Sequence, residues 1–233
     1  MSDVPVITVD GPSGTGKGTI CLRLASLLGW HFLDSGALYR VLAHAALQSD
    51  IGLENSQQLC ALAETLDISF QPDPQGGVCI LLGNIDVTAE IRTESCGNAA
   101  STIAVYPGVR QGLLSRQRDF KQAPGLIADG RDMGTIVFPD AVLKIYLTAS
   151  ADERAKRRYK QLKEQGFSVN LARLSAEIAE RDRRDLQRTV SPLTPAPDAI
   201  IIDTTAVSAE EVVQQVMDRV YKIFPETGRA ATD

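Results

Sequence analysis

Short apolar runs recur along this chain at helix-length intervals, and this alternation restricts the fold more than any other feature. The runs cover residues 6–9, 31–33, 126–128, 142–147 and 199–202, and four of these five pass directly into Asp or Thr followed by Gly, Ser or Thr. Alternating strands and helices are typical of a parallel sheet covered on both faces. We therefore expect an α/β fold with a five-stranded parallel sheet flanked by helices.

Helical periodicity fills the intervals between the predicted strands. Residues 18–28 carry one apolar stripe before the stop signal Gly29, formed by Ile20, Leu24, Leu27 and Leu28. Pro107 suits the first turn of another helix, which would carry Arg110 away from its apolar side. The stretch 68–87 breaks the alternation, because turn residues separate three β-rich runs there. It predicts a small antiparallel β-meander inserted into the parallel fold.

Composition narrows the classes of protein to which the chain can belong. Its 233 residues suit one domain, residues 1–233, and 44% hydrophobic residues suffice for a core. The net charge of −5 argues against a nucleic-acid-coating protein. The sequence has no apolar run of transmembrane length and no secretory signal. Four scattered cysteines and two histidines offer no zinc-ligand spacing. With neither a signal nor a transmembrane run in the sequence, we expect a cytoplasmic protein with reduced thiols and no membrane partner.

The first predicted strand leads into a glycine-rich loop that ends in lysine. The pattern G-x-x-x-x-G-K is made by Gly11, Pro12, Ser13, Gly14, Thr15, Gly16 and Lys17, with Gly18 and Thr19 following. Glycines let successive N–H groups point into one concavity, and the next helix N-terminus and Lys17 add positive charge. The loop predicts a nucleotide phosphate site. Because Gly18 stands where the general pattern has Ser or Thr, we expect Mg²⁺ to be held by phosphates and water rather than by direct protein ligation.

Arginines follow the next predicted strands. Residues 34–40 contain Arg40, and residues 129–135 contain Arg131 and Asp132. Because ligands bind beyond the carboxyl ends of parallel strands, these arginines and Lys17 are expected to face one crevice and to favour a second anionic ligand. Residues 151–190 hold eleven basic against seven acidic side chains, about +4 in total. Taken together, two basic helices around Gly166 are typical of a mobile cover over phosphates, although i,i+4 pairing on a solvated face explains any single arginine. Helical spacing places Arg181, Arg184, Asp185 and Arg188 on one face.

In combination these motifs closely resemble the bacterial cytidylate kinase family, over residues 5–222 and including the meander. The resemblance rests on residues 11–19, 34–40, 127–135 and 180–185. It implies a P-loop kinase core, an acceptor-nucleotide region at 35–105 and a helical lid at 152–190. It also implies transfer of the γ-phosphate of ATP to CMP or dCMP, with Mg²⁺ as cofactor. Apart from the resemblance, nothing in the sequence demands an oligomer and the net charge is acidic, so we expect a monomer without a nucleic-acid partner.

The resemblance also implies roles for individual residues. Lys17 and residues 11–19 would bind ATP, with Arg157 a lid contact to it. The acceptor contacts would be Ser35, Arg110 and Asp132 to the base, Ser101, Arg181 and Asp185 to the sugar, and Arg40, Arg131 and Arg188 to the phosphate. Lys17, Arg131 and Arg188 would act on the transferring group. A carboxylate and a guanidinium also suit cytosine on chemical grounds, since uracil reverses the donor and acceptor at both positions.

Other readings compete with this one. A P-loop switch protein that binds GTP would need a guanine-reading N-K-x-D element, which the sequence lacks, and its D-x-x-G letters occur only at 73–76 within the meander. Among kinases, the runner-up is a P-loop enzyme that prefers UMP or another small acceptor. A nucleic-acid binder ranks last, because few aromatic residues accompany the basic ones.

Overall fold

The computed structural model describes residues 4–72, 78–164, 166 and 168–225. Its packing divides the chain into two compact units. The first unit takes residues 1–33, 120–187 and 191–233, and the second takes 34–119 and 188–190.

A five-stranded sheet of order β2-β6-β1-β7-β8 forms the centre of the first unit. Its strands are β1 (Val6–Asp10), β2 (His31–Asp34), β6 (Leu126–Gly130), β7 (Leu143–Thr148) and β8 (Ile200–Asp203). The β1–β6, β1–β7 and β7–β8 ladders are parallel, and every residue of β1 and β6 is buried, as in a sheet covered on both faces. The predicted five-stranded parallel sheet is confirmed. Because the chain turns to opposite sides of β1, the loop after β1 lies at a topological switch point.

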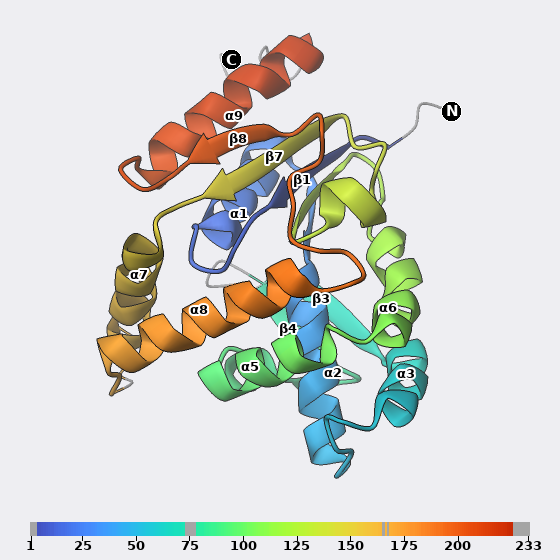
Figure 1. Ribbon diagram of the computed structural model, residues 1–233. Helices are drawn as coiled ribbons and strands as arrows, with labels where there is room; N and C mark the ends of the chain where they lie inside the picture. The colour runs from blue at the N-terminus through green and yellow to red at the C-terminus, as the bar shows by residue number, and fades with distance from the viewer. Residues whose placement is uncertain (1–3, 73–77, 165, 167, 226–233) are drawn as a thin grey trace. The chain divides into compact units, whose positions relative to one another are not determined.

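Helices α1 (Lys17–Leu28) and α9 (Ala209–Ile223) pack together against this sheet (Figure 1). Ile20 and Leu24 of α1 join the core, and Gly29 ends the helix in the left-handed conformation, as predicted. Leu27 was wrongly placed on the apolar stripe, since it is 63% exposed. Leu27 lies on nearly the same side of the helix as buried Ile20, seven residues earlier, but it lines an open pocket between α1 and α9, where no side chain covers it completely.

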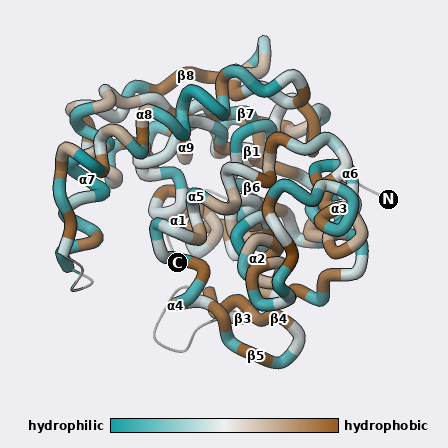
Figure 2. The backbone as a smooth tube through the Cα atoms, turned by 60° about the horizontal axis from the view of Figure 1, so that its bottom comes forward, coloured by the Kyte–Doolittle hydropathy of each residue, from teal (hydrophilic) through white to brown (hydrophobic). Residues whose placement is uncertain are grey.

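Helices α7 (Ala151–Glu164) and α8 (Leu171–Gln187) form a helical hairpin. Its small core contains Ala155, Leu162, Leu174 and Ile178. Hydrophilic and hydrophobic residues alternate along α7 (Figure 2), as expected of helices that bury one face. Arg188 lies beyond the end of α8 and belongs to the second unit, so the prediction that it shares a helical face with Arg181 and Asp185 is wrong.

The second unit is mostly helical. Its helices are α2 (Ser35–Gln48), α3 (Ser56–Thr65), α4 (Thr88–Ile91), α5 (Glu94–Ile103) and α6 (Pro107–Asp119). Leu42, Leu59 and Leu113 are fully buried. Helices α3 and α6 approach closely at Gly108. A Cβ at this position would lie only 2.4 Å from the Cys60 sulfur, so glycine permits the contact. Arg110 is buried, like the apolar residues of α6. The expectation that it faces away from the buried side of the helix is therefore wrong.

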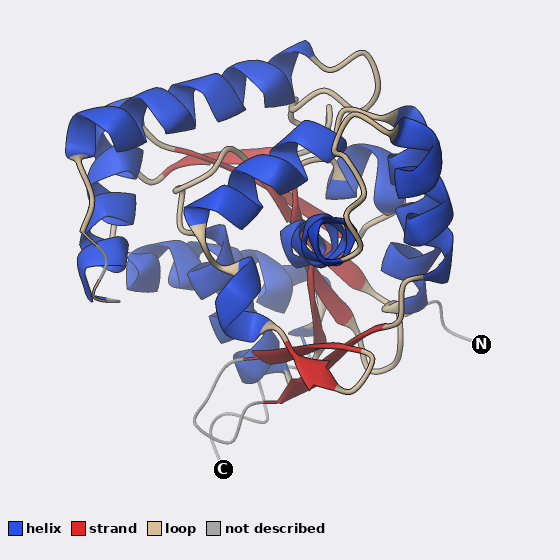
Figure 3. Ribbon diagram, turned by 90° about the horizontal axis from the view of Figure 1, so that it is seen from below, coloured by secondary structure: helices blue, strands red, loops and turns tan. Residues whose placement is uncertain are grey.

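A three-stranded antiparallel sheet completes the second unit (Figure 3). It is made of β3 (Ile68–Pro72), β4 (Val78–Leu82) and β5 (Ile85–Asp86), with Phe70 opposite Ile80. Gly83 takes a φ of 60° in the turn between β4 and β5, where glycine has no steric penalty. The predicted meander is confirmed, and the turn predicted within 72–77 lies largely outside the described residues.

Candidate functional site

The loop after β1 is built from backbone conformations that only glycine adopts readily. Gly11 has a φ of 144°, and a Cβ there would lie 2.1 Å from the Leu147 carbonyl oxygen on the neighbouring strand. Gly16 has a φ of 91° and precedes α1, where its carbonyl accepts from the Ile20 N–H at 3.1 Å. The loop therefore leads directly into a helix N-terminus, the arrangement in which backbone N–H groups and the helix dipole bind phosphate.

Lys17 is a buried cation beside this loop. Its Nζ donates to the Pro12 carbonyl at 2.8 Å, across the curl of the loop. Burial, together with the nearby cations Arg131 and Arg181, lowers the pKa of Lys17 to about 8, against the opposing effect of the Asp129 carboxylate. Lys17, Arg131 and Arg181 thus place mutually repelling positive charges beside the loop.

Two arginines from the α7–α8 hairpin reach the same loop. Arg154 of α7 donates to the Ser13 carbonyl at 3.1 Å and pairs with Asp182 of α8 at 2.7 Å. Arg181 of α8 donates to the Ser13 hydroxyl at 3.5 Å. Within the first unit the structure therefore brings the loop and the hairpin together. Arg154 was counted among the basic residues of the hairpin but given no role, because charge patterns do not show which arginine packs inward.

Arg131 and Asp185, both predicted acceptor-site residues, form an ion pair. Arg131 follows β6, and its Nε donates to the Asp185 carboxylate at 2.9 Å with both side chains largely buried. Burial is the largest single effect and would lower the pKa of Arg131, but the hydrogen bond and attraction to Asp185, together with nearby Asp129 and Asp182, raise it overall. The guanidinium is thus permanently charged and is held in one orientation.

Asp132, the predicted base-reading carboxylate, precedes a single turn of π-helix, η1 (Met133–Val137), and is buried. Asp10, at the end of β1, accepts from the N–H groups of Met133 and Gly134 at 2.9 and 2.8 Å. Burial raises the pKa of Asp10 to about 6 despite these two hydrogen bonds. Asp10 therefore fixes the turn that carries Asp132. The sequence showed only that an Asp follows the first strand.

Arg157, the predicted lid contact to ATP, bonds to protein groups in this structure. It pairs with Glu153 at 2.9 Å and donates to the hydroxyl of Thr204 at 3.1 Å and to its carbonyl. The Thr204 hydroxyl in turn donates to the Thr15 carbonyl at 3.2 Å, so Arg157 is connected to the loop through Thr204. Its contact with ATP stays a prediction.

The remaining predicted acceptor residues belong to the second unit. The Arg40 guanidinium donates to the carbonyls of Ile91 and Thr93 at 2.7 and 3.2 Å, at the end of α4. Arg110 donates to the Ala104 carbonyl at 3.2 Å and lies 5.5 Å from the centre of the Tyr39 ring.

Two serines and Arg188, which is buried, complete the predicted acceptor residues of the second unit. Ser101 is buried on α5, and within the described residues its hydroxyl has no hydrogen-bond partner. A buried hydroxyl without a partner is costly, which is consistent with a ligand-binding role. Ser35 donates to Gln117 at 2.8 Å, a contact that sequence reasoning did not anticipate.

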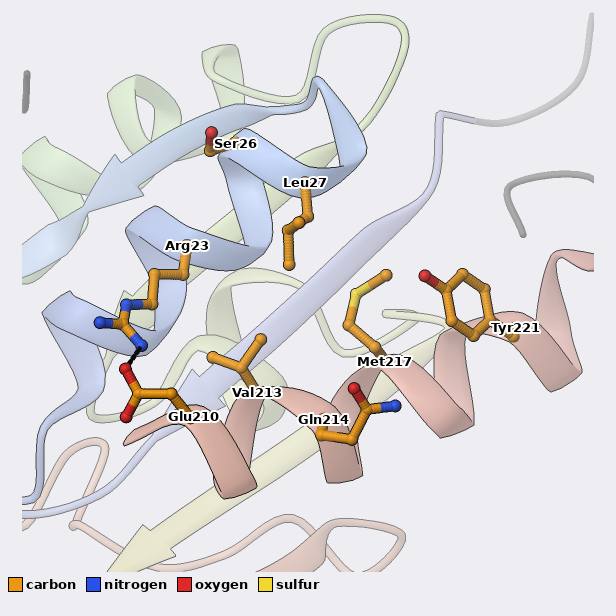
Figure 4. Close-up of a pocket in the computed structure, with 8 residues that line it drawn as sticks. All are labelled: Arg23, Ser26, Leu27, Glu210, Val213, Gln214, Met217 and Tyr221. Atoms are coloured by element: carbon orange, nitrogen blue, oxygen red, sulfur yellow. Dashed lines mark hydrogen bonds and ion pairs between the residues drawn. The ribbon is translucent and has the colours of Figure 1, made fainter. Parts of the chain in front are cut away.

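A pocket of about 420 Å³ lies elsewhere, between α1 and α9 of the first unit (Figure 4). Arg23 and Glu210 form an ion pair at one end, and the rest of the lining is Ser26, Leu27, Val213, Gln214, Met217 and Tyr221. It contains none of the predicted site residues. In the parts of the chain that the structure describes, no helix is both long and apolar enough to span a membrane.

Comparison with known proteins agrees with this geometry. The sequence profile of the cytidylate kinase family matches residues 7–222. The chain is 60% identical to the cytidylate kinase of Aeromonas hydrophila over 213 residues, 91% of this chain and 92% of that protein. It is 57% identical to the cytidylate kinase of Shewanella denitrificans over 217 residues, 93% of this chain and 96% of that protein.

Among solved structures, a gluconokinase from Sinorhizobium meliloti 1021 aligns with a TM-score of 0.48 and 13% identity, over 98% of each chain. A likeness this remote says nothing about substrate. The sequence match, in contrast, extends over nearly the whole chain and includes the loop, Arg131 and the α7–α8 hairpin. The chain is therefore a phosphotransferase of the nucleoside monophosphate kinase class and belongs to the cytidylate kinase family.

Proposed function

We propose that this kinase transfers the γ-phosphate of ATP to CMP and dCMP, producing ADP and CDP or dCDP. The observation that carries the proposal is the buried positive charge around the loop, where Arg131 and Arg181 lie close enough to Lys17 to lower its pKa. A polyanion bound among these cations would relieve their mutual repulsion. Membership of the cytidylate kinase family supports cytidine nucleotides as acceptors.

In this proposal Lys17 and residues 11–19 bind the phosphates of ATP, and Arg157 contributes from the α7–α8 hairpin acting as a lid. Arg131, Arg188 and Arg40 bind the acceptor phosphate, while Ser101, Arg181 and Asp185 surround the sugar. The nucleophile is an oxygen of the CMP phosphate, which is ionised at neutral pH, so no general base is needed. The protein aligns two polyanions and compensates the charge on the group in transfer.

Recognition of cytosine is assigned to Asp132, Arg110 and Ser35. A carboxylate accepts from the exocyclic amine, and a guanidinium donates to the ring acceptors. Uracil would place its O4 against the Asp132 carboxylate and its N3–H against Arg110. Because buried polar groups left unpaired cost about 1–3 kcal/mol each, UMP is expected to be a poor acceptor.

The kinase family uses ATP with Mg²⁺, and the residues around the loop fit that ion. A Cβ at Gly18 would stand 3.6 Å from an oxygen of Asp129, so a buried carboxylate lies beside the first turn of α1. We assign Mg²⁺ to the ATP phosphates and water, with the Asp129 carboxylate accepting from the ion's water ligands rather than binding the ion directly. When bound, the ion neutralises charge on the phosphates.

An acceptor panel tests the proposal. ATP is offered with CMP, dCMP, UMP, AMP or GMP, and ADP formation is followed in a coupled assay. We expect the highest kcat/KM with CMP and dCMP. A preference for UMP would support the rival P-loop kinase for another pyrimidine, and absence of transfer to any cytidine nucleotide would refute the proposal. Lys17→Ala is the matched control, because it should lower turnover by several orders of magnitude without unfolding the protein.

A further inference from the structure

A buried glutamine holds the hydroxyl of Ser35. Ser35 is the first residue of α2, and its Oγ donates to Gln117 Oε1 of α6 at 2.8 Å. The exposed fractions of Ser35 and Gln117 are 4% and 2%. The amide nitrogen of Gln117 donates to the Leu113 carbonyl at 3.3 Å. Both ends of the glutamine amide are therefore engaged, one by its own helix and the other by Ser35.

The two hydrogen bonds together fix the direction of the Ser35 hydroxyl. If the amide were reversed, its oxygen would face the Leu113 carbonyl, and two acceptors would meet without a proton between them. Leu113 therefore requires the amide nitrogen, which leaves the amide oxygen to face Ser35. A serine hydroxyl has one proton and two lone pairs. With its proton committed to Gln117, the Ser35 oxygen can only accept a hydrogen bond from any further group.

We infer that Gln117 is a specificity-positioning residue, which locks the Ser35 hydroxyl as an acceptor so that it selects a base with an exocyclic amine over one with a carbonyl. This inference rests on the proposed function, in which Ser35 contacts the cytosine edge. Cytosine offers an amine donor at that position, whereas uracil offers the O4 acceptor. The Ser35 oxygen, which can only accept, is complementary to the amine of cytosine and repels the O4 of uracil.

Helix α6 also carries Arg110, seven residues before Gln117, which places the two side chains on one face two turns apart. Arg110 can only donate hydrogen bonds. One helix therefore supplies a donor and determines the acceptor character of Ser35. A buried amide with no such task would be less favourable than leucine or methionine at the same place, because amide burial must be compensated by hydrogen bonds.

The test is the ratio of kcat/KM for CMP to that for UMP in Gln117→Met. Methionine fills a similar volume but cannot accept the Ser35 proton, so the hydroxyl can turn and donate to the O4 of uracil. We expect the ratio to fall about tenfold, the effect of one hydrogen bond changing sign, with UMP gaining relative to CMP. A merely structural role would lower both activities in parallel and leave the ratio unchanged, and that result would overturn the inference.

Further variants isolate the mechanism. Gln117→Glu keeps an acceptor toward Ser35 but sets its second oxygen against the Leu113 carbonyl. It should therefore lower the stability of the protein while retaining a ratio within about threefold of the parent. In a Ser35→Ala background, Gln117→Met should leave the ratio where Ser35→Ala alone puts it, since no hydroxyl is left to orient. An equal additional loss in that background would refute the link. If the methionine variant does not fold, Gln117→Asn withdraws the amide by one methylene and gives the same comparison.

The parent enzyme separates this inference from the function on which it rests. If the parent shows no preference for CMP over UMP, the proposed function fails, whatever the variants do. If the parent prefers CMP and Gln117→Met shows the same preference, only the role of Gln117 fails.

Discussion

Binding of ATP should draw a proton onto Lys17. In the nucleotide-free protein, burial and the neighbouring Arg131 and Arg181 lower the pKa of Lys17 from 10.5 to about 8. The phosphates of ATP bring several negative charges to this ammonium group and reverse that balance. A lysine that is partly neutral in the free enzyme therefore becomes fully protonated in the complex.

The size of the effect follows from the two pKa values. With a pKa of about 8, about three-quarters of the Lys17 side chains are neutral at about pH 8.5, but only about a tenth at about pH 7. If ATP restores the ordinary value, binding takes up about 0.75 proton at about pH 8.5 and about 0.1 at about pH 7. The sign is fixed: affinity for ATP falls as pH rises above the pKa of the free enzyme, by up to about tenfold per pH unit, until the pKa of the complex is reached.

Isothermal titration calorimetry measures this uptake directly. ATP with Mg²⁺ is titrated, without acceptor, into the protein in pairs of buffers that share a pH but differ in ionisation enthalpy. Lys17→Arg is the matched control, because a guanidinium keeps its charge throughout this range and cannot take up a proton. Equal uptake by Lys17→Arg and the parent would assign the proton to another group. No uptake by the parent at about pH 8.5 would refute the argument that buried positive charge lowers the pKa of Lys17.

Three further results are expected. Asp132→Ala should lower the ratio of kcat/KM for CMP to that for UMP about 10- to 100-fold, because it removes the carboxylate that we propose faces the exocyclic amine, and an unchanged ratio in the acceptor panel would exclude it from base recognition. Arg131→Ala should lower kcat/KM for CMP about 100-fold, since a charged hydrogen bond contributes about 1.5–3 kcal/mol, and unaltered steady-state kinetics would place the acceptor phosphate elsewhere. Leu24→Ala should lower the free energy of unfolding by about 2–5 kcal/mol and Leu27→Ala by less than about 0.5, and equal losses in urea titration would contradict the burial of these neighbours on α1.

The strands could be predicted because each is a short apolar run with its own boundary. Three of those runs, at β1, β6 and β7, are largely buried inside the sheet. The turn after each run is made by residues with a strong local preference. Leu27 shows where this reasoning stops. Its residue type suits the core as well as that of Leu24, but only the placement of α9 decides how wide the covered stripe is.

The site could be predicted by residue type but not by hydrogen-bond partner. The glycines and Lys17 were evident because the loop needs special backbone conformations and one cation. The partners Asp10, Arg154 and Gln117 were not, because each depends on elements distant in the sequence: Asp10 meets η1, and Arg154 meets the loop. An arginine that binds substrate and one that supports the loop look alike in a sequence.

Two aspartates of α8 stabilise buried arginines of the first unit by pairing with them. Asp182 pairs with Arg154, and Asp185, one turn later on the same face, pairs with Arg131. Buried charges are tolerated when paired, so each aspartate keeps one guanidinium charged and oriented before any ligand arrives. Lys17 has no such ion pair to a carboxylate among the contacts of the described residues and donates to a carbonyl instead, and its pKa is lowered accordingly. The fold thus keeps Arg131 and Arg154 charged and oriented without a ligand. Lys17, in contrast, is expected to become fully protonated only when phosphates bind beside it.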